Sequence, residues 1–76
     1  MKYYKLSKTN PGWDSLHIDL KAAYALYDPL IIAADYAYTL SLERWEELSN
    51  VEILTLVLGK KLPVFICHNG RWEEQP

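Results

Sequence analysis

Residues 62–76 read LPVFICHNGRWEEQP and contain the most specific local signal in the chain. Asn69-Gly70 favours a type I′ hairpin turn, because both central positions of that turn have a positive φ and these residue types adopt it readily. Pro63 lacks a backbone N–H, and the start of a strand tolerates that loss. We therefore predict a strand over 63–68, a tight turn at 69–70 and an antiparallel return strand over 71–75.

Cys67 and His68 stand side by side in this segment, as a catalytic pair or two metal ligands would. Adjacent residues of a strand point to opposite faces of the sheet, so these two side chains do not converge on one atom. A structural zinc site needs about four ligands, whereas the chain has one cysteine and two histidines. We predict a buried Cys67, a partly exposed His68, and neither a metal site nor a catalytic pair.

The preceding segment, residues 51–58 (VEILTLVL), is compatible with two structures. Its β-branched residues and continuous apolar run suit a central strand. Asn50 as a cap, Glu52 in the first turn and Gly59 just after the end suit a helix, with lysines at 60–61 near its negative pole. We favour the helix.

A further helix is predicted over 42–48, because Ser41 is a preferred N-cap residue. Trp45 and Leu48 lie on one side of this helix together with Leu42, at spacings of three. The glutamates at 43, 46 and 47 lie mostly on the other side. Trp45 is therefore expected to belong to the core.

Asp28-Pro29 indicates the start of another helix, because aspartate suits the N-cap and proline suits the first helical position. We predict this helix over 29–38, with an alanine-rich face that lets a neighbouring element approach closely. Tyr36 and Tyr38 are two residues apart and cannot share a helical face, so at least one of them is expected to be exposed.

The N-terminal part is predicted to contain two strands. Residues 2–6 (KYYKL) have good strand propensity. Residues 15–20 alternate apolar and polar positions, which favours a half-buried strand. A helix starting at Asp14 or Ser15 is the alternative, since Leu16 and Leu20 would then share a face with later apolar residues.

The expected fold is therefore a small α+β domain spanning 1–76, with two N-terminal strands, two to three central helices and a C-terminal hairpin. A chain of 76 residues forms one domain with a small core. One cysteine excludes an internal disulfide, and the start of the chain lacks the apolar run of a signal peptide. These features predict a cytoplasmic protein.

The charge distribution disfavours several classes of function. Residues 28–58 carry six carboxylates and one arginine, a net charge of −5, and no basic stripe for a phosphate backbone is present. A winged-helix DNA-binding regulator has a similar element order, but residues 51–58 offer few side chains that read bases. Phosphate-loop, dinucleotide and nucleophile-elbow motifs are absent from the sequence. We predict a protein that is not an enzyme and uses no cofactor.

The acidic middle of the chain suggests instead an interaction surface. We expect a module that binds another protein with a basic surface, through an acidic helical face for attraction and exposed aromatic side chains for affinity. A charged face that only keeps the protein soluble explains the same residues. The candidate partner-binding residues are Asp35, Tyr36, Tyr38, Glu43, Glu46, Glu47 and Glu52.

Two more specific hypotheses remain open. In size and acidity the chain is similar to the small proteins with which phages and mobile elements occupy a basic groove of a host enzyme, such as anti-CRISPR inhibitors. That similarity implies a nucleic-acid mimic with a basic protein as its target. A homodimer formed through an edge strand or through the alanine-rich helix is also compatible with the sequence.

Overall fold

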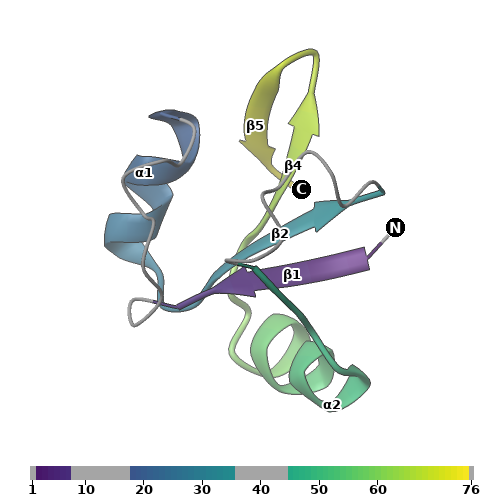
Figure 1. The fold of residues 1–76 in the computed structure, drawn as a ribbon. Helices are drawn as coiled ribbons and strands as arrows, with labels where there is room; N and C mark the ends of the chain where they lie inside the picture. The colour runs from purple at the N-terminus through teal and green to yellow at the C-terminus, as the bar shows by residue number, and fades with distance from the viewer. Residues whose placement is uncertain (1, 8–17, 36–44, 76) are drawn as a thin grey trace.

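The computed structural model describes residues 2–7, 18–35 and 45–75, and within these ranges the chain forms a five-stranded mixed sheet between two helical segments (Figure 1). The strand order is β3-β1-β2-β4-β5, and β2 and β4 are parallel while all other neighbours are antiparallel. The predicted α+β class is therefore confirmed. The elements are β1 (Lys2–Leu6), α1 (Ile18–Leu26), β2 (Leu30–Ala34), β3 (Glu46–Glu47), α2 (Asn50–Glu52), η4 (Ile53–Gly59), β4 (Val64–His68) and β5 (Arg71–Glu74).

The central strand β2 replaces the helix predicted over 29–38, and that prediction is wrong for Leu30–Ala34. Leu30, Ile31 and Ile32 are fully buried, because β2 has a strand on each side and a helix over each face. A short continuous apolar run is typical of a strand buried on both faces. This burial outweighs the local helix-start signal of Asp28-Pro29.

Helix α1 covers one face of the sheet and begins where a strand was predicted. Leu20 and Ala23 are buried against the sheet, with Tyr24 and Tyr27 packed beside them, at helical spacings of three and four. Ile18 is 78% exposed, whereas the predicted strand pattern would bury it. The strand predicted over 15–20 is therefore wrong for 18–20, and residues 15–17 lie outside the described residues.

Strand β3 pairs with β1 at one edge of the sheet, so the helix predicted over 42–48 is wrong for residues 46–48. Trp45 and Leu48 are both buried, but they contribute to the cores on opposite faces of the sheet. Positions three apart face opposite sides of an extended chain, whereas a helix would place them on the same side. Residues 42–44 lie outside the described residues.

The other face of the sheet is covered by α2 and η4, which together form one helical segment over 50–59. The helix that we favoured over 51–58 lies within it. Ser49 is the N-cap and forms a capping box with Glu52, in which each side chain bonds the other residue's backbone N–H. The turns of η4 are wide, and the Lys60 N–H donates to the carbonyl oxygen of Thr55 at 2.9 Å.

Strands β4 and β5 pair antiparallel, with His68 opposite Arg71. Between them Asn69 has φ 53° and Gly70 has φ 78°. The prediction that Cys67 is buried is wrong, because it lies near the far end of β4, where its side chain is exposed. Figure 1 shows this end of the hairpin projecting beyond the other strands.

Candidate functional site

The predicted partner-binding residues do not form one helical face. Glu46 and Glu47 lie on the edge strand β3, where neighbouring side chains point to opposite sides, and Glu52 lies in α2. Asp35 follows β2 and is exposed. Tyr36, Tyr38 and Glu43 lie outside the described residues. The acidic helical face expected at 42–48 is therefore wrong for its described part.

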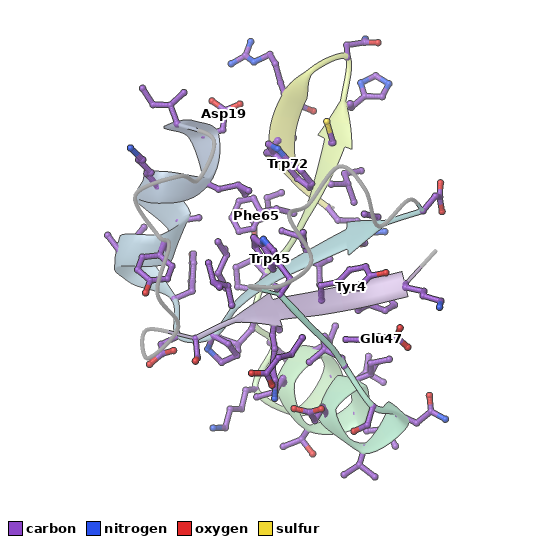
Figure 2. The ribbon with its side chains drawn as sticks, in the orientation of Figure 1. Tyr4, Asp19, Trp45, Glu47, Phe65 and Trp72 are labelled. Atoms are coloured by element: carbon purple, nitrogen blue, oxygen red, sulfur yellow. The ribbon has the colours of Figure 1, made fainter. Side chains whose placement is uncertain are left out.

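Lysines of β1 lie beside Glu46, Glu47 and Glu52. The Nζ of Lys5 donates a hydrogen bond to Oε2 of Glu52 and lies 3.9 Å from Oε2 of Glu46. The Nζ of Lys2 lies 3.5 Å from Oε1 of Glu47, which is labelled in Figure 2. Three carboxylates and two ammonium groups leave this edge with a net charge of −1.

The Glu52 carboxylate is held in its ionised form. The hydrogen bond from Lys5 is the main cause that lowers the pKa of Glu52, and the bond from the Ser49 backbone N–H lowers it further. Partial burial opposes this shift and is outweighed. Glu52 is therefore suited to anchoring Lys5 and the start of the helix, and it is poorly suited to donating a proton at neutral pH.

A surface cavity of about 400 Å³ opens between this cluster and the helical segment. Its described lining has no histidine or cysteine, and the hydroxyl of Thr55 donates to the Val51 carbonyl oxygen. Apolar walls with a small excess of negative charge suit an alkyl chain that ends in a cation. The lining includes three apolar and three charged residues: Pro29, Val51, Leu56, Lys5, Glu46 and Glu52.

Beside the cavity, the outer face of the helical segment carries three exposed apolar side chains, which we call the α2–η4 ridge: Val51, Leu54 and Leu58. Their exposed fractions are 71%, 60% and 64%. Ile53 and Val57 face the sheet, and the four-residue repeat places Leu54 and Leu58 on the opposite side. This ridge was not among the predicted site residues, because a continuous apolar run hides which of its members face inward. The four-residue repeat is the signal that would have revealed it.

The described aromatic side chains form part of the core instead of an exposed surface. Tyr4 and Trp45 are buried, which confirms the core position expected for Trp45. Phe65 and Trp72 pack against the same cluster, between α1 and the sheet (Figure 2). Exposed aromatic anchors are therefore absent from residues 2–7, 18–35 and 45–75.

No family model matches the chain, and neither curated proteins nor solved structures gave a match. Neither helical segment in the described part of the chain is long and apolar enough to cross a membrane. Among the same residues, no three histidine, cysteine or acidic side chains are grouped as a metal ion would require.

Proposed function

We propose that the protein is a non-enzymatic interaction module that binds another protein through the α2–η4 ridge and the acidic edge beside it. The observation that carries this proposal is the ridge itself, since Val51, Leu54 and Leu58 are each at least 60% exposed on one helical face. Scattered apolar side chains are common on protein surfaces, but a contiguous group beside polar residues is typical of a binding site.

The charges beside the ridge favour a partner with basic groups. Glu46 and Glu47 are exposed, and the cluster that they form with Glu52 has a net charge of −1 after pairing with Lys2 and Lys5. A negative rim increases the association rate of a positively charged partner, and salt weakens this effect. The adjoining cavity has room for the alkyl chain and charged end of a partner's lysine or arginine.

The pairing of the glutamates supports a protein interface over a nucleic-acid mimic. A mimic of a phosphate backbone presents a row of unpaired negative charges at regular spacing. In the described part of the chain, Glu46, Glu47 and Glu52 instead each lie beside a lysine of β1. In this proposal the apolar ridge therefore contributes most of the binding free energy. The charges increase the association rate and orient the partner.

The proposal is tested by affinity capture from a lysate of the source cells, read by mass spectrometry. A ridge variant, Leu54→Ser with Leu58→Ser, is expected to lose the proteins that the wild type captures. The control replaces two apolar residues of α1 that are somewhat more exposed, Ile18→Ser with Leu26→Ser, and should retain the captured proteins. Circular dichroism checks that both variants are folded. Equal capture by the ridge variant and the wild type would refute the proposal.

The role of charge is tested separately with the purified captured partner. Glu46→Gln with Glu47→Gln is expected to slow association and to flatten its dependence on salt concentration. The control is Glu73→Gln with Glu74→Gln, an adjacent exposed pair on the opposite edge strand β5. If both double variants slow association equally, the effect is one of net charge and not of this edge.

A further inference from the structure

We propose that the α2–η4 ridge binds a second copy of the same chain, in an antiparallel two-fold arrangement of the helical segments. This inference rests on the proposed function only for the binding surface, the α2–η4 ridge, and it assigns a second copy of the chain to that surface. The evidence for this arrangement is the order of acidic, apolar and basic side chains along the helical segment. The acidic Glu46 lies beside Val51 in the cavity wall, the ridge spans 51–58, and basic residues at 60–61 follow the ridge.

The apolar part of this surface is self-complementary. A two-fold axis makes residue i contact residue j of the partner, and residue j contact residue i. Leu54 lies near the middle of the ridge, so an axis there places Leu54 against its own copy. Val51 then meets Leu58 of the other protomer, and this contact occurs twice. All three exposed side chains are covered by one such arrangement.

The charges select the antiparallel orientation. With the segments antiparallel, Lys60 and Lys61 of one protomer lie near Glu46 of the other, and the symmetry repeats this pairing. A parallel arrangement would place like charges together, which disfavours binding. Both lysines are exposed in the monomer and lie directly after the helix end at Gly59.

Other surfaces are less suited to self-association. The alanine-rich segment that suggested one route is the buried central strand β2. At the β5 edge, Asp19 of α1 accepts the Trp72 backbone N–H at 3.1 Å, so a donor that an added strand would use is occupied. At the opposite edge, β3 has only two residues. On α1, the exposed Ile18 and Leu26 stand at opposite ends of the helix and form no continuous ridge.

The size of the surface predicts a concentration-dependent dimer. A helical segment of ten residues is about 15 Å long. A contact centred on it buries less than the roughly 800 Å² per partner that stable specific complexes bury. We therefore expect a dissociation constant in the micromolar range or weaker.

Sedimentation equilibrium of the purified chain is the first test. The weight-average mass is expected to rise from the 8.9 kDa monomer towards twice that value as the protein concentration increases. Leu54→Ser is expected to remain monomeric over the same range, while Ile18→Ser should behave as the wild type. A wild type that stays monomeric up to about 1 mM overturns the dimer.

Charge reversal tests the orientation. One variant carries Glu46→Lys, and the other carries Lys60→Glu with Lys61→Glu. Each alone is expected to dimerise at least about tenfold more weakly than the wild type, because like charges meet at both ends. An equimolar mixture should restore association, since opposite charges then meet at both ends of the heterodimer. A mixture that associates no better than either variant overturns the antiparallel arrangement.

These results separate this inference from the proposed function. A monomeric wild type that still captures a foreign protein through the ridge overturns only the second-copy assignment. A wild type that dimerises as described, but whose lysate capture is unaffected by the ridge substitutions, overturns the foreign-partner proposal and leaves the dimer supported.

Discussion

The two faces of the sheet differ in how their helices are held and in what they leave exposed. On the α1 face, the core is rich in aromatic residues, and Asp19 joins the helix to the backbone of β5. On the α2–η4 face, the core is mainly aliphatic, and Glu52 joins the helix to Lys5 of β1. Each helix is therefore fixed to the sheet by one carboxylate from its first turn.

The outer surfaces of the two helices show the difference that bears on function. Exposed apolar side chains on α1 stand at opposite ends of the helix, whereas those on α2–η4 recur at helical spacings of three and four, next to a cavity and an acidic edge. The α1 face has the features of a closed core. The α2–η4 face combines a core with an exposed apolar surface, and we therefore propose this face as the binding surface.

The largest expected effect is a loss of stability when either core is disrupted. Two neighbouring residues of β2 allow each core to be tested separately. Ile31 belongs to the α2–η4 core and Ile32 to the α1 core, and both are fully buried. Ile31→Ala and Ile32→Ala are each expected to lower the free energy of unfolding by about 2–5 kcal/mol, because each leaves a cavity. Urea denaturation measures both. A loss below about 1 kcal/mol for one variant would show that its face is not a packed core.

The next effect concerns the start of α2. Ser49→Ala removes the side chain that accepts the Glu52 backbone N–H, and it is expected to lower the free energy of unfolding by about 1 kcal/mol. Ser49→Thr keeps the hydroxyl and serves as the control, with a smaller loss. Equal losses in the two variants would mean that the capping hydrogen bond contributes nothing. Ridge binding should weaken in parallel, because the cap fixes the helix that presents the ridge.

Local sequence patterns predicted some elements correctly and failed where tertiary contacts outweigh them. The helical segment at 50–59 has its own cap and end signals, so its prediction needed no distant contact. Leu30–Ala34 has a helix-start signal before it, yet burial between two strands makes it the centre of the sheet. Trp45 and Leu48 are three residues apart, a spacing that would place them on one side of a helix. The same spacing also fits an extended strand whose two faces contact different cores, as the structure shows.

The arrangement of the candidate site was not predicted. Glu46, Glu47 and Glu52 were expected on or near one acidic helical face, whereas they lie on β3 and in α2. Their pairing with lysines of β1 depends on contacts such as Lys5 to Glu52, which are 47 positions apart in the sequence. No local pattern encodes such a contact. The ridge was missed because the inward and outward residues of 51–58 are equally apolar.

The smallest expected effect is a pH dependence confined to the α2–η4 face. The pKa of Glu52 lies below its ordinary value of 4.5 in the folded protein, chiefly because Lys5 donates a hydrogen bond to the carboxylate. A lowered folded-state pKa means that Glu52 stabilises the fold fully above its unfolded pKa. This contribution is lost as the pH falls through the folded-state pKa. The loss therefore begins near pH 4.5 and is complete at a lower pH.

Glu52→Gln isolates this contribution, because glutamine keeps the size of the side chain and loses the titrating charge. At pH 7 the variant is expected to be less stable than the wild type, and the difference should shrink as the pH is lowered below 4.5. Urea denaturation at several pH values measures it, with Glu47→Gln as the control for an exposed edge carboxylate. A difference that stays constant with pH would show that the charge of Glu52 does not stabilise the fold. In that case the capping geometry alone would account for the effect of the substitution, and the α2–η4 face would lack the charge-dependent attachment to β1 that we infer.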